Sequence, residues 1–156
     1  EVFAYQGRAF GDEIPKYITI KLNSDADKIF GLDKVDMKKK IYVVEGPIDS
    51  LFLDNCIAVA GADFNNVQGD LTVIYDNEPR NKEIVKQIEK TINQGRSVVL
   101  WPDGMKEKDI NDMILSGYTK LEIQKIIEDN TFEGVSAKLR FTGWKKIDER
   151  SVSKTI

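Results

Sequence analysis

The stretch Ile41-Tyr42-Val43-Val44-Glu45-Gly46 decides the fold that we predict for this chain. Its four consecutive apolar residues are typical of a strand that is buried on both faces, as in a parallel sheet. Pro47 follows Gly46 where a helix would begin, a position at which the missing N–H of proline costs nothing. Ligands bind at such strand ends in open α/β sheets. Glu45 could therefore hold a metal ion or transfer a proton, or it could be a solvated residue at the end of a strand.

A second buried-strand pattern, Leu71-Thr72-Val73-Ile74-Tyr75, ends in Asp76-Asn77-Glu78. Side chains alternate along an extended chain, so Asp76 and Glu78 should point to the same side. Two carboxylates without a basic partner repel each other unless a divalent cation lies between them. Oxygen ligands suit Mg²⁺ or Mn²⁺, and a chain with no histidine and a single cysteine does not suit zinc. The two acidic strand ends therefore predict a site for divalent metal.

Further acidic residues could share this site. Asp49 lies four residues beyond Glu45 and so one helical turn into the next predicted element. Asp109 and Asp112 form a third acidic cluster, which follows a predicted strand at 97–101. An alternative for this third cluster is helix capping, because aspartate is a favoured N-cap residue. If all three clusters face one crevice at the edge of the sheet, they would hold one or two divalent ions.

Composition sets broad limits on the function. The length of 156 residues corresponds to one domain of common size, and an apolar content of 41% is enough for a hydrophobic core. We expect no membrane segment, and Cys56, as the only cysteine, to be a buried structural thiol. The net charge is −3, but six basic against two acidic residues from Lys138 onward give that tail +4 and leave −7 for the rest. The tail could contact phosphate or the acidic body, or it could be a solvated extension.

The order of the predicted elements indicates an α/β fold. Strands at 2–5 and 16–22 flank turn residues and predict an antiparallel β-hairpin. Strands then alternate with helices, which predicts a parallel sheet flanked by helices on both faces. The expected strands are 41–44, 57–60, 71–75 and 97–101, with a last strand at 139–144, and the expected helices are 48–55, 81–94, 109–116 and 119–129. We divide the chain into a hairpin and connection at 1–37, a core at 38–130 and a basic C-terminal extension at 131–156.

The acidic strand ends resemble those of a known family. Glu45-Gly46, followed by Asp76-Asn77-Glu78 and a later acidic loop, is similar to the Toprim domain. This domain is the metal-binding core of bacterial-type primases, of type IA and II topoisomerases and of some nucleases. The family has Asp-x-Asp at the second strand end. Here Glu78 replaces the second Asp, which keeps the charge and the oxygen ligands but lengthens their reach.

Two further motifs resemble primases in particular. Lys108-Asp109-Ile110-Asn111-Asp112 is similar to the Lys-Asp-Pro-Asp block of bacterial primases, whose second acid falls on Asn111. Gln6-Gly7-Arg8 and Pro15-Lys16-Tyr17 resemble the segment that precedes Toprim in the primase RNA-polymerase core. The resemblance extends over residues 2–117. It fits best the primases of T4-like tailed phages, which share the Asp-Asn-Glu-Pro-Arg-Asn run and a basic, Trp-containing C-terminus.

The resemblance implies a DNA primase core that makes short RNA primers from ribonucleoside triphosphates on a single-stranded DNA template. It also implies a phage-encoded protein in the cytoplasm of a bacterial host, with the replicative helicase as a partner and no membrane association. The implied catalytic residues are Glu45, Asp76 and Glu78; the implied ligands of Mg²⁺ or Mn²⁺ are Glu45, Asp49, Asp76, Glu78 and Asp109; and the implied nucleotide or DNA contacts are Arg8, Lys16 and Asn111.

Other interpretations stay open at this point. A Toprim nuclease would use similar acids to activate water, and a nucleic-acid or helicase-binding module would use none of them for catalysis. Arg8 and Lys16 could also be ordinary exposed residues of two strands.

Overall fold

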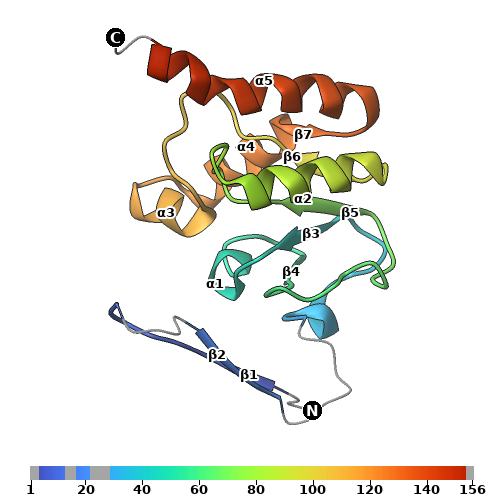
Figure 1. Ribbon diagram of the computed structural model, residues 1–156. Coiled ribbons are helices and arrows are strands. Elements are labelled where there is room, and N and C mark those ends of the chain that lie inside the picture. Colours follow the sequence, from blue (N-terminus) through green and yellow to red (C-terminus); the bar gives the residue numbers. More distant parts are fainter. Residues whose placement is uncertain (1–3, 13–16, 22–28, 154–156) are drawn as a thin grey trace.

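The computed structural model describes residues 4–12, 17–21 and 29–153, and its central element is a mainly parallel five-stranded sheet (Figure 1). The spatial order of its strands is β4-β3-β5-β6-β7. The first four run parallel, and β7 pairs antiparallel with β6 at one edge. The predicted α/β class with a parallel core is therefore confirmed. The strands span Ile41–Val44 (β3), Cys56–Ala58 (β4), Leu71–Ile74 (β5), Ser97–Val99 (β6) and Thr131–Phe132 (β7).

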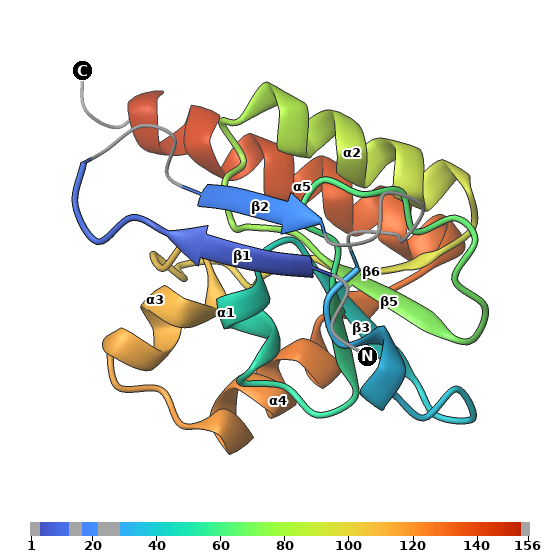
Figure 2. The ribbon, with the colours of Figure 1, turned by 90° about the horizontal axis from the view of Figure 1, so that it is seen from below.

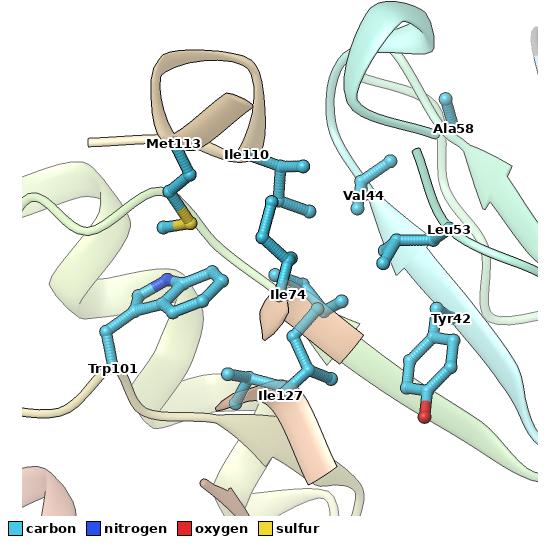
Figure 3. Packing of buried hydrophobic residues seen from close by; sticks show 11 residues of the cluster. Tyr42, Val44, Leu53, Ala58, Ile74, Trp101, Ile110, Met113 and Ile127 are labelled. Carbon is cyan, nitrogen blue, oxygen red and sulfur yellow. The ribbon is translucent and has the colours of Figure 1, made fainter. Parts of the chain in front are cut away.

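Helices cover both faces of this sheet, as predicted. On one face, side chains of α3 and α4 pack with Tyr42, Val44 and Ile74 of the central strands (Figure 3). On the other face, α2 and α5 cover Val98 and Leu100. All four residues of β3 and all four of β5 are consequently buried. The helices are α1 (Pro47–Ser50), α2 (Lys82–Asn93), α3 (Ile110–Leu115), α4 (Lys120–Asp129) and α5 (Gly134–Ser153), with a 3-10 turn at Leu32–Lys34.

Side-chain caps set the starts of three helices where the sequence predicts them. The Asn81 side chain accepts hydrogen bonds from the first-turn amides of α2. Thr119 and Glu122 form a capping box at the start of α4. Asp109 caps α3 and accepts a hydrogen bond from the Asp112 amide at 2.7 Å. Each cap satisfies backbone donors that a helix N-terminus otherwise leaves without a partner.

The predicted strand at 139–144 is wrong, because these residues lie in the middle of helix α5. The apolar residues that α5 buries are Ala137, Phe141 and Trp144. Their spacing of four and then three residues is helical, whereas the strand prediction relied on Leu139, which is 72% exposed. Since α5 packs on the sheet through these three residues and β7 belongs to the sheet, residues 131–144 are part of the folded core.

Strands β1 (Ala4–Arg8) and β2 (Tyr17–Lys21) form a separate two-stranded antiparallel sheet. It lies next to α1 (Figure 2). Residues 13–16 lie outside the described part of the chain, so the turn of the expected hairpin stays a prediction. Within the described residues, no helix is both long enough and apolar enough to span a membrane.

Candidate functional site

A cavity of about 480 Å³ opens at the carboxyl end of the parallel strands. Five carboxylates from the three segments that follow β3, β5 and β6 line it, together with two cations, one of which is Arg8 of β1. We call this space the acid cavity. Its charged lining residues are Arg8, Glu45, Asp49, Asp76, Lys108, Asp109 and Asp112. The expected convergence of the three acidic clusters on one crevice is thus what the fold produces, because β3, β5 and β6 are adjacent and parallel.

Glu45 and Asp49 form the first wall of the acid cavity. Glu45 directly follows β3, and the backbone amide of Gly61 donates a hydrogen bond to its carboxylate. Partial loss of hydration nevertheless raises the pKa of Glu45. Asp49 lies on α1, where its Oδ1 accepts a hydrogen bond from the Asn111 amide at 2.8 Å. A side chain at Gly46 would stand 3.3 Å from Asp49 Oδ2, so glycine leaves the room that this carboxylate occupies.

Asp76 is the most perturbed of these acids. Burial first, and then the charges of Asp49 and Asp109, raise its pKa from the ordinary 3.8 to about 7. The pKa of Asp49 rises to about 6, again through burial first, while the Asn111 amide opposes the shift. Neighbouring carboxylates that disfavour each other's ionisation are a signature of an anionic site without enough bound positive charge.

The cluster at the start of α3 combines capping with a place in the cavity. Asp109 Oδ2 lies 3.0 Å from Lys108 Nζ, and its side chain is only 15% exposed. This contact with Asp109 is the main reason that the pKa of Lys108 is raised. Lys108 therefore stays protonated beside the acids, and its charge lowers the pKa values of Asp49 and Asp76 in part. The capping alternative and the site interpretation are thus compatible.

Glu78 lies outside the acid cavity. The expected alternation of Asp76 and Glu78 fails because β5 ends at Ile74 and the chain then turns, with the Glu78 amide donating to the Asp76 carbonyl at 2.9 Å. The Glu78 carboxylate instead accepts from Asn81 Nδ2 at 3.1 Å and lines a neighbouring groove with Arg80. Its charge still raises the pKa of Asp76. A role of Glu78 as a catalytic residue or metal ligand stays a prediction.

The three residues expected to contact nucleotide or DNA differ in where the structure places them. Arg8 lines the acid cavity, whereas Lys16 lies outside the described residues. Asn111 also lines the cavity, but its known contribution is its backbone amide, which holds Asp49. The sequence analysis missed Asn77 as a site residue. Its side chain bonds to the loop before Asp109, and no pattern in the sequence indicates such long-range bonds.

The donors of the acid cavity fit a hard divalent ion in type and in charge. They are oxygen atoms with an excess of negative charge, which Mg²⁺ and Mn²⁺ prefer. Over the described ranges, however, no three Asp, Glu, Cys or His side chains converge closely enough to hold one ion as they stand. Coordination by three of them would therefore require side-chain rotation.

Comparison with known proteins gives the family context of this site. No family profile matches the chain. Its sequence is 38% identical to the DNA primase of Enterobacteria phage T4 over an alignment of 156 residues, which covers 92% of this chain and 44% of the phage protein. This chain is homologous to part of a phage DNA primase. The resemblance to primases of T4-like phages is thereby confirmed.

Solved primase structures share the fold of this homologous region. The RNA polymerase domain of Mycobacterium tuberculosis primase DnaG matches with a TM-score of 0.57 at 18% identity, over 80% of this chain and 50% of that one. The same domain in complex with double-stranded DNA matches with a TM-score of 0.58 at 19% identity, over 80% and 48% of the two chains. At these identities the match shows a common fold. This chain spans less than half the length of the phage relative.

Proposed function

We propose that this chain is the Toprim-containing catalytic part of a DNA primase, which joins ribonucleotides into short primers on single-stranded DNA. The observation that carries the proposal is the acid cavity. Four carboxylates from the three segments that follow β3, β5 and β6 face this space together with Arg8; they are Glu45, Asp49, Asp76 and Asp109. Homology to a phage primase supports the reaction class. In the proposed division, residues 1–37 contribute to the primase core beside the Toprim domain at 38–130.

The same four carboxylates would hold Mg²⁺ or Mn²⁺. When bound, such ions activate the primer 3′-hydroxyl and neutralise charge on the reacting phosphate and the leaving pyrophosphate. Other groups of the chain orient these carboxylates and supply positive charge. The amides of Gly61 and Asn111 orient Glu45 and Asp49. Arg8 and Lys108 at the same cavity would offset the negative charge of an incoming triphosphate or of the template.

An incorporation assay tests the proposal. The chain is incubated with labelled ribonucleoside triphosphates and single-stranded DNA in Mn²⁺ or Mg²⁺, and the products are separated by size. Asp76→Asn should abolish incorporation. Asp70→Asn is the matched control, because Asp70 precedes the same strand at its opposite end and is exposed. Metal-dependent incorporation by wild type and the control, but not by Asp76→Asn, supports the primase.

Other results of this assay identify the two alternatives. Degradation of the DNA that depends on Asp76 would replace the primase with a nuclease. If neither activity occurs even when the chain is supplied within the longer protein, a binding module remains. A replicative helicase as partner and the cytoplasm of a bacterial host as location belong to the proposal, since they accompany primase function in a phage.

A further inference from the structure

The loop between β6 and α3, residues 100–109, carries Lys108 and Asp109 into the acid cavity. It is long and has no regular structure of its own, and Figure 1 shows it reaching up from β6 to α5 and then passing down to α3. A loop of this kind positions a carboxylate only if other parts of the protein fix its backbone. Its start is held by the Leu100 amide, which donates to the Asn130 carbonyl at 3.0 Å, and by Trp101 Nε1, which donates to the Tyr75 carbonyl at 2.8 Å. Further contacts come from Asn77 after β5 and from helix α5.

Asn77 holds this loop through its backbone amide and its side-chain amide. Its backbone amide donates to the Lys108 carbonyl at 2.6 Å. Its side-chain Nδ2 donates to the carbonyls of Met105 at 3.0 Å and Glu107 at 3.2 Å. Its Oδ1 accepts from Trp144 Nε1 at 3.2 Å. If the oxygen and nitrogen of the Asn77 side chain exchanged places, the oxygen would face two carbonyl acceptors and the NH₂ group would face the Trp144 N–H donor. Only one orientation of this amide therefore satisfies all three side-chain bonds.

Helix α5 fixes the loop at a second point and supports Asn77. Arg140 donates to the Trp101 carbonyl at 3.0 Å and contacts Asp103 Oδ1 at 3.1 Å. One helical turn later, Trp144 is 2% exposed, packs on Phe141 and presents only its N–H to Asn77. The indole is thus fixed by the core of the protein. Asn77 joins this rigid side chain to three positions of the loop, Met105, Glu107 and Lys108.

We propose that Asn77, held by Trp144, is a positioning residue that keeps Lys108 and Asp109 at the acid cavity. Asn77 lies directly beside Asp76 in sequence, so one turn of chain supplies a candidate ligand and fixes the loop that supplies another. The catalytic meaning of this arrangement rests on the proposed function. The arrangement itself is a claim about loop order and can be tested without activity.

Three variants of the chain separate positioning from general stability. Asn77→Ala removes all three side-chain bonds of Asn77. Trp144→Phe keeps an aromatic ring in the core and removes the N–H that reaches Asn77, together with part of the buried indole. Tyr42→Phe is the matched control, because it removes one hydrogen bond, from Gln124 at 3.1 Å, in a buried residue of β3 that does not line the acid cavity.

Amide hydrogen exchange, measured by NMR in metal-free buffer, reports on the loop. The Asn111 and Asp112 amides bond to the carboxylates of Asp49 and Asp109, so their exchange should accelerate when the loop loosens. We expect at least about tenfold acceleration in Asn77→Ala and about threefold to tenfold in Trp144→Phe, the range for loss of one neutral hydrogen bond. Tyr42→Phe should leave both amides unchanged.

Manganese binding, followed by the electron paramagnetic resonance signal of free Mn²⁺, reports on the site. Removing groups that orient metal ligands typically weakens metal affinity by about 10- to 100-fold, and we expect this for Asn77→Ala, with a smaller loss for Trp144→Phe. Unchanged exchange and unchanged affinity in a folded Asn77→Ala would overturn the proposal, as would unchanged exchange in a folded Trp144→Phe. If Trp144→Phe does not fold, the Asn77→Ala data decide alone. If wild type binds no Mn²⁺, the proposed function fails while the exchange data still decide the positioning role.

Discussion

Replacing Asp76 by Asn should stabilise the protein at alkaline pH in the absence of metal. The reason is the pKa of Asp76, which rises from 3.8 to about 7 through burial and through the charges of Asp49 and Asp109. Between these two pH values the folded protein binds more protons than the unfolded chain, so stability falls as pH rises through this window. The neutral amide of Asn has a similar shape and does not titrate. The variant therefore does not lose this stability as the pH rises.

The expected gain in the free energy of unfolding follows from the rise in the pKa of Asp76. At about 1.4 kcal/mol for each pKa unit, the rise from 3.8 to about 7 corresponds to about 4 kcal/mol above pH 8 for a group that titrates alone. Asp76 titrates together with Asp49 and Asp109 and keeps some contact with solvent, both of which reduce the effect. We therefore expect Asp76→Asn to add about 2 kcal/mol to the free energy of unfolding at pH 8.5, and nothing below about pH 4.

Urea unfolding of wild type, Asp76→Asn and the exposed control Asp70→Asn measures this difference. The series is run at pH 4, 6 and 8.5 in chelator and repeated at pH 8.5 with Mn²⁺. In chelator the stability difference should grow with pH for Asp76→Asn only. With Mn²⁺, wild type should gain stability and the variant should gain less, because binding to the folded state stabilises it. If Asp76→Asn is no more stable than wild type at pH 8.5 in chelator, burial and the neighbouring charges do not raise the pKa of Asp76 as inferred here.

Two further predictions concern the ends of the chain. Arg8→Ala should reduce ribonucleotide incorporation at least about tenfold with a change in melting temperature under about 2 °C, because Arg8 is exposed but lines the acid cavity; an unreduced rate would make Arg8 an ordinary surface residue. Truncation after Glu133 should unfold the protein, as seen by loss of a cooperative melt, because loss of buried Phe141 and Trp144 costs about 3 to 5 kcal/mol each. A cooperative melt of the truncated chain would contradict the packing of α5.

The strands and the acid cavity were predictable because they depend on local patterns. Val43 and Val73 lie in short apolar runs, and an acid follows each run directly, so pairing of these runs as parallel neighbours brings Glu45 and Asp76 to one edge. The sequence pattern could not predict the direction in which the Glu78 side chain points. Its orientation depends on where β5 ends, and the tight turn that follows carries the Glu78 side chain toward Asn81.

The long-range bonds of Asn77 were beyond reach for a related reason. An asparagine after a strand is typical of a turn, and this is all that its neighbours in sequence indicate. Its partners Met105 and Glu107 are 28 and 30 residues away, and Trp144 is 67 residues away. Only the packing of α5 against the sheet brings that indole to the loop. The role of Asn77 is therefore a property of the assembled fold.

The C-terminal helix shows what net charge alone could not give, which is its packing against the sheet. Residues from 138 onward carry +4 by count, and this suggested a tail that binds polyanions or the acidic body. A helix, however, can expose its charged residues on one face while it buries another, and α5 buries Ala137, Phe141 and Trp144 against the sheet. The Arg140 side chain binds the β6–α3 loop at the Trp101 carbonyl and at Asp103. The same helix that completes the core thus also holds the loop on which Asp109 reaches the acid cavity, so a substitution on the inner face of α5 would alter both stability and the site.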